Sequence, residues 1–160
     1  MATSGYRQPP GGAPRPGGQP TPLRGPLLIG VGLAGTADQV VLHQLLGWHH
    51  LYDGGGLSAG LVSDGIFHVL STVLLVLGVV VTLRSRDRRG LRRRRIAGGV
   101  LVGAGGFNLY DGTIQHKVLH LHEVRRGVDP LPYDAAFIGV AALLLLGGFV
   151  LLRRGGSHRH

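Results

Sequence analysis

Four apolar stretches, each close to 20 residues long, constrain most strongly what this chain can fold into. They cover about residues 27–48, 62–83, 96–119 and 133–152. A helix of roughly 20 residues is long enough to cross the ~30 Å hydrocarbon layer of a bilayer. The fourth stretch has no polar face that a helix of a soluble bundle would turn to water. The sequence therefore predicts an all-α fold, an integral membrane four-helix bundle whose direct partner is the lipid bilayer.

The remaining segments are short and polar. Residues 1–25 are rich in Pro and Gly and predict a disordered tail. Residues 26–153 form the predicted membrane domain, and residues 154–160 form a second tail. The chain contains no Cys, which excludes a disulfide scaffold, a zinc finger, an iron–sulfur site and a cysteine nucleophile.

Basic residues are distributed unequally between the two predicted faces of the membrane. Fourteen of the 17 Lys and Arg residues lie in the N-terminal tail, in segment 84–95 and at the C-terminal end. Because Lys and Arg accumulate on the cytoplasmic side, a multi-pass protein of the plasma membrane with both termini cytoplasmic is expected. The loops 49–61 and 120–132 then face outward. Contact with anionic lipid explains the arginines of segment 84–95, so no nucleic-acid partner is expected.

The first and third stretches repeat a polar pattern. Asp38, His43 and His49 have the spacing Asp-x4-His-x5-His, and a shift of 73 residues aligns them with the same spacing in the third stretch. Three polar matches in register inside apolar segments are poorly explained by coincidence. Two tandem two-helix repeats are therefore predicted, related by a two-fold axis along the membrane normal.

Histidine and aspartate are the residues with most potential for chemistry. All His except His158 and His160 fall in the outer half of the predicted bundle or at its rim. An Asp that faces lipid costs a few kcal/mol, so these side chains should point into the bundle around one outward-opening pocket. At about 100° per residue, His49 falls near the face of Asp38, whereas His43 lies about 140° away. The predicted ligands are His43, His68 and His116, with His49 and His122 as further candidates and Asp38, Asp64 and Asp111 as orienting or neutralising groups.

Imidazoles that converge from several helices suit a transition metal or a haem iron. Without Cys or a useful Met, a soft Cu(I) site is disfavoured, and Cu(II), Zn, non-haem Fe and bis-His haem remain open. The predicted function is an outward-facing metal or haem site.

Two other interpretations remain. Asp38 and Asp111 lie near the middle of the predicted membrane, as a proton-coupled transporter or proton relay would need. Alternatively, the Asp–His pairs hold helices together as a structural scaffold with no ligand. The glycine-rich helix faces are also compatible with a homodimer. The sequence leaves the enzyme question open.

Three stretches resemble the signatures of a family of small four-span bacterial membrane proteins carried under a domain-of-unknown-function label. They are GVGLAGTADQVVLHQLLGWHHLYDG, SDGIFH and GGFNLYDGTIQHKVLHLHEVR, and the resemblance covers roughly residues 25–152. Members of that family are sometimes associated with a copper-handling cytochrome oxidase assembly factor. The resemblance thus implies a link to respiratory oxidase metal supply or electron transfer, with oxidase assembly components as partners. It assigns no role to any residue.

Overall fold

The computed structural model describes residues 22–89, 93–120, 122–125 and 127–156, and within these ranges the chain forms helices and no strands. The predicted all-α class is confirmed. In chain order the elements are α1 (Arg24–Asp38), η1 (Gln39–Leu45), α2 (Gly56–Arg89), α3 (Arg93–Tyr110), η2 (Asp111–Val118) and α4 (Leu131–Gly156). The elements η1 and η2 are π-helices that continue α1 and α3.

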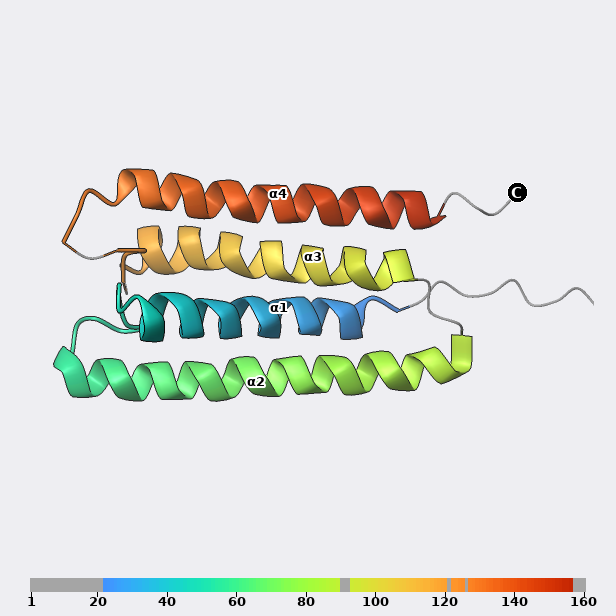
Figure 1. Cartoon of the computed structure of the whole chain (residues 1–160), viewed down its shortest axis with the longest axis horizontal. Coiled ribbons are helices and arrows are strands. Elements are labelled where there is room, and N and C mark those ends of the chain that lie inside the picture. The colour runs from blue at the N-terminus through green and yellow to red at the C-terminus, as the bar shows by residue number, and fades with distance from the viewer. Residues whose placement is uncertain (1–21, 90–92, 121, 126, 157–160) are drawn as a thin grey trace, which may run out of the picture.

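The four long helices lie side by side in a row (Figure 1). Helix α1 packs against α2 and α3, and α3 also packs against α4. Across the described ranges α2 and α4 do not pack on each other, so the arrangement differs from the closed bundle expected from the sequence. The start of α1 and the end of α4 lie at one end of the row, and the two π-helices lie at the other (Figure 1).

Glycines allow the two inner helices to approach closely. A Cβ added at Gly30 would collide with the backbone of α3, and one added at Gly103 would collide with the backbone of α1 at Leu27. These two glycines are 73 residues apart, so each makes the contact that the repeat predicts for the other. Small residues at helix contacts are typical of association in lipid, where backbones pack directly.

Three helical segments are long and apolar enough to cross a membrane: Arg24–Leu45, Gly56–Ser85 and Leu131–Arg154. Large apolar side chains cover their outer surfaces; Leu61, Val69 and Leu143 are more than half exposed. The third predicted stretch is also helical, as α3 followed by η2, but it is not among these apolar segments. It lies inside the row between α1 and α4.

Several boundaries differ from the predicted ones. The first helical segment ends at Leu45, which leaves His49 in the following loop. Helix α2 continues to Arg89, so much of the predicted basic loop is helical. The predicted tails fall largely on residues 1–21 and 157–160, which lie outside the described residues with Arg92, Arg126, His158 and His160.

Candidate metal centre

The π-helices change which polar side chains share a face. Their hydrogen bonds join residues five apart, as from Leu46 N to Val41 O and from Leu119 N to Ile114 O, both 2.8–2.9 Å long. In an α-helix, residues five apart point about 140° away from each other. In a π-helix they lie about one turn apart. The repeated Asp-x4-His spacing therefore matches the π-helical period, and the α-helical angles expected from the sequence are wrong here.

The first repeat brings together Asp38, His43 and His49, hereafter set one. One donor atom from each lies within 4.8 Å of the others, and all three residues are buried. The Nε2 atom of His43 lies 3.1 Å from Asp38 Oδ2. The rings of His43 and His49 meet edge to face with centroids 4.3 Å apart.

The second repeat brings together Asp111, His116 and His122, hereafter set two, again with donor atoms within 4.8 Å of one another. The Nε2 atoms of the two histidines are 3.0 Å apart. The Nε2 of His116 lies 3.3 Å from Asp111 Oδ2, and that of His122 lies 3.8 Å from Asp111 Oδ1. Two donors held about 2.0–2.1 Å from one ion lie about 3.0–3.4 Å apart, so this spacing suits a shared metal ligand.

The two sets touch each other through the loop histidines. The rings of His49 and His122 stack with centroids 4.6 Å apart and planes 13° from parallel. Each of these residues also reaches the loop of the other repeat. The Nδ1–H of His49 donates to Val124 O at 2.8 Å, and the Nδ1–H of His122 donates to Leu51 O at 3.1 Å. Leu51 and Val124 are themselves 73 residues apart, so the crossed contacts follow the predicted two-fold relation.

These crossed bonds fix the tautomer of both rings. A carbonyl oxygen only accepts, so Nδ1 carries the proton and Nε2 is left as the lone-pair atom of a neutral imidazole. Burial disfavours the charged form and lowers the pKa of both His49 and His122 to about 4. Both rings are therefore neutral near pH 7. Nitrogen donors in this state are ready to bind a metal.

Two further carboxylates stand behind the helical histidines. The Nδ1–H of His43 donates to Asp64 Oδ1 at 2.7 Å. The Nδ1 of His116 lies 3.6 Å from Asp134 Oδ1 in the same arrangement. Such carboxylates orient metal-bound imidazoles and raise their basicity. Asp64 thus takes the orienting role, and Asp134 takes the same role in the second repeat.

Asp134 is the functional candidate that the sequence pattern did not single out. The signal for it is a second register: a shift of 70 residues aligns α2 with α4. Identical pairs in that register are Leu61/Leu131, Asp64/Asp134, Phe67/Phe137, Leu74/Leu144, Leu75/Leu145 and Gly78/Gly148. The connection between the helices of the second repeat is three residues shorter, which hides Asp134 from the 73-residue shift.

Two other histidines have contrasting positions. His50 joins the site, because its Nδ1 donates to Asp64 Oδ2 at 2.6 Å. His68 belongs to neither set within the described residues, and its buried Nδ1 has no hydrogen-bond partner. The structure thus brings together seven of the eight sequence-predicted site residues and leaves His68 outside.

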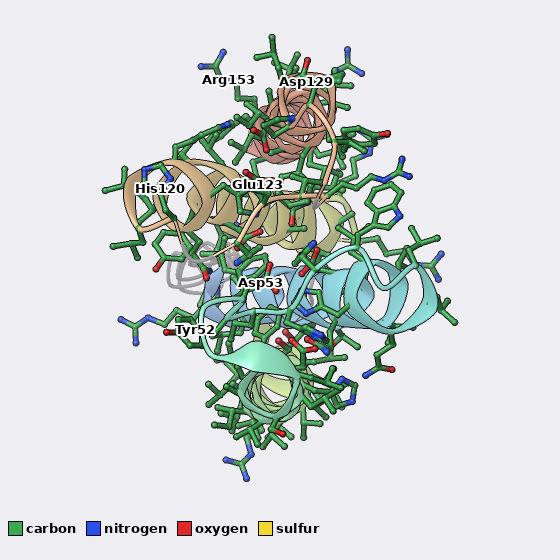
Figure 2. The ribbon with its side chains drawn as sticks, turned by 90° about the vertical axis from the view of Figure 1, so that its left-hand side faces the viewer. Tyr52, Asp53, His120, Glu123, Asp129 and Arg153 are labelled. Carbon is green, nitrogen blue, oxygen red and sulfur yellow. The ribbon has the colours of Figure 1, made fainter. Side chains whose placement is uncertain are left out.

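A polar cavity of about 660 Å³ connects set two to the loop end of the molecule. His116, His122 and Asp134 form part of its wall. Lys117, half exposed, donates a hydrogen bond to Asp134 Oδ2. Figure 2 looks onto this end, where the lining residues Asp53 and Glu123 lie near the middle of the row and His120 lies to one side.

The fold and the site define an α-helical membrane protein with two adjacent His/Asp groups able to hold metal ions. The chain belongs to the family described as "Predicted membrane protein (DUF2243)", whose profile matches residues 25–155. The resemblance seen in the sequence is thereby confirmed. Neither the curated proteins nor the solved structures include a match.

Proposed function

We propose that this protein binds a pair of transition-metal ions near the outer face of the membrane. Set one, made of Asp38, His43 and His49, holds one ion, and set two, made of Asp111, His116 and His122, holds the other. Asp64 and Asp134 orient the helical histidines. Each set offers two imidazoles and one carboxylate and leaves coordination positions open for water or a small molecule.

The observation that carries this proposal is the state of the loop histidines. His49 is 1% exposed, its Nδ1–H is used by Val124, and its Nε2 has no hydrogen-bond partner. A buried nitrogen lone pair without a donor costs free energy, and native structures contain few such atoms. A metal ion would satisfy it. A purely structural scaffold would instead pair this atom, as well as the unpartnered Oδ1 of Asp38.

Charge supports the same conclusion. Four buried carboxylates, those of Asp38, Asp64, Asp111 and Asp134, surround the imidazoles. Lys117 is the basic side chain that pairs with them in the described ion pairs. Buried carboxylates are stable only when they are paired or bind cations. Two divalent ions would supply the missing positive charge.

The donor set favours non-haem Fe, Zn or Cu(II) over haem. Two imidazoles and one carboxylate with open positions are typical of non-haem Fe(II) sites, and the same donors suit Zn and Cu(II). A bis-His haem needs a planar macrocycle between its two axial rings. Neighbouring rings here have centroids 4.3–4.6 Å apart, and the more distant pairs at 6.2 and 6.4 Å have a third imidazole close to both members.

We also propose that α3 with η2 is a fourth span and that both termini are cytoplasmic. The absence of Cys allows a direct test with single cysteines. Ser58→Cys at the loop end should react with a membrane-impermeant maleimide in intact cells, whereas Arg93→Cys should react only after lysis. The reverse pattern would invert the orientation.

Metal analysis of the protein purified in detergent tests the proposed function. We expect about two ions per chain, no Soret band, and loss of both ions in the double variant His49→Ala plus His122→Ala. The control is His120→Gly, a loop histidine outside both sets. A metal-free wild type that folds normally would favour the scaffold. Proton flux lost in Asp38→Asn without any bound metal would favour the relay. A role in supplying metal to an oxidase rests on the family resemblance alone.

A further inference from the structure

An apolar groove runs along the membrane-facing side of set one. It is a cavity of about 650 Å³ between α1 and α4, with α3 behind it. Its walls include the apolar side chains of Leu33, Val41, Val140 and Leu144. Because Leu33, Val41 and Val140 are about half exposed, the groove opens sideways toward the lipid of a surrounding bilayer.

Small residues create this groove in one repeat and bulky residues fill the same positions in the other. Phe107 stacks on Phe67 with centroids 6.0 Å apart, on the opposite side of the row. The groove is lined instead by alanines at the corresponding positions. The matched pairs are Ala34/Phe107, Ala37/Tyr110 and Ala136/Ile66.

The groove contains a polar group that lacks a partner. Asp38 lines it, is 92% buried by its 8% exposure, and has an Oδ1 atom with no hydrogen-bond partner. Its other oxygen, Oδ2, faces His43. The amide of Asn108 also lines the groove. An occupant is therefore expected to offer a hydrogen-bond donor to the carboxylate.

Aromatic rings and a cation lie beside the outer part of the groove. Trp48 and Tyr133 both line it, with ring centroids 5.6 Å apart. The guanidinium of Arg125 lies 5.3 Å from the centroid of each ring and donates to Tyr133 Oη at 2.5 Å. This grouping of Trp, Tyr and Arg is typical of the membrane interface.

We propose that this groove binds a quinol, meaning a hydroxylated aromatic ring with a long apolar tail, with one hydroxyl donating to Asp38. The carboxylate of Asp38 excludes an anionic head, and Arg125 disfavours a cationic one, so the head is neutral. The aromatic walls at Trp48, Tyr133 and Phe137 suit a ring. The apolar surface facing the bilayer suits the tail. A volume of about 650 Å³ lies within the range of small-molecule sites.

The site bears directly on the metal centre, since Asp38 also belongs to set one. A bound quinol would place its hydroxyl next to the carboxylate that we propose as a ligand of the first ion. This consequence rests on the proposed function. Binding of the quinol itself rests only on the groove, so the two are tested separately.

The single tryptophan of the chain gives a direct readout, because Trp48 lines the groove. A decyl-tailed benzoquinol is titrated into the full-length protein in detergent while Trp fluorescence is followed, with and without added metal. We expect saturable quenching. The dimethyl ether of the same compound has the same tail and ring but no donor, and it should bind about tenfold more weakly or worse.

Matched variants locate the binding. Ala136→Phe fills the groove and should weaken quinol binding at least about tenfold, whereas Ile66→Phe at the corresponding position of the other repeat should not. Ala37→Leu provides a second, smaller filling. Equal binding of the ether, equal effects of the two Phe variants, or no saturable quenching would overturn the proposal. Metal content measured on the same samples separates this result from the metal centre. Ions without quinol binding refute the groove alone, and quinol binding without ions refutes the metal centre alone.

Discussion

The two repeats hold the same donors in different surroundings. In the first, Asp64 accepts hydrogen bonds from His43 Nδ1, His50 Nδ1 and Leu51 N, at 2.7, 2.6 and 2.8 Å. These contacts bring the loop down over Asp64. In the second, Asp134 pairs with the half-exposed Lys117 and lines a polar cavity at the loop end.

This difference separates what the sites share from what they do not. The ligands, the π-helices and the crossed bonds to the loop carbonyls follow the two-fold relation, so they define the geometry of each set. The approaches to the sets break it. Set one adjoins an apolar groove facing the bilayer, whereas set two adjoins a polar cavity. Two similar ions would thus be reached from different solvents.

The largest expected effect comes from removing the orienting carboxylates. Asp64→Asn should weaken metal binding at set one by up to about 100-fold, because this carboxylate orients His43 and also holds the loop. Asp134→Asn should weaken set two by only about tenfold, since its contact with His116 is longer. Competition titrations against a chelator measure both affinities. Equal losses at both sets would contradict the comparison.

A smaller effect concerns access from water. A water-soluble chelator should remove the ion of set two at least about tenfold faster than that of set one, because the polar cavity reaches His116 and His122. Metal release should therefore show two phases. Glu123→Gln in the cavity wall should change only the fast phase, with Ser58→Ala outside the cavity as the control. A single phase would mean that the two approaches do not differ.

The smallest effect tests the two-fold relation in the loops. Gly47 and His120 are 73 residues apart and both have left-handed backbones, with φ of 59° and 49°. Gly47→Ala should lower the unfolding free energy by about 1 kcal/mol, because a side chain is strained there. His120→Gly removes such a strain and should not destabilise. Thermal unfolding in detergent measures both changes, and a stable Gly47→Ala variant would contradict the shared conformation.

The repeated Asp-x4-His-x5-His pattern carried much of the site, because three polar residues in apolar segments can be recognised without a structure. The pairing of Asp38 with His43 could not be predicted from α-helical angles, since it depends on a π-helix that hydropathy does not reveal. The loop position of His49 was missed because the apolar stretch runs past the end of the helix. Asp134 was hidden by the different register of α2 and α4.

His68 illustrates the opposite error. Its position near Asp64 in one apolar segment made it a predicted ligand, but it lies outside both sets. Metal binding in His68→Ala decides the matter. Retention of both ions is expected, and loss of an ion would restore His68 as a ligand.

The most direct test of the paired sets is the metal content of a variant that lacks one of them. The variant His116→Gln plus His122→Gln removes both imidazoles of set two and leaves Asp38, His43 and His49 intact. X-ray absorption on this variant, together with its metal-to-protein ratio, reports both the number and the ligands of the bound ions. We predict one ion per chain with two imidazoles and oxygen donors. Two ions, or none in a folded protein, would contradict two separate sets.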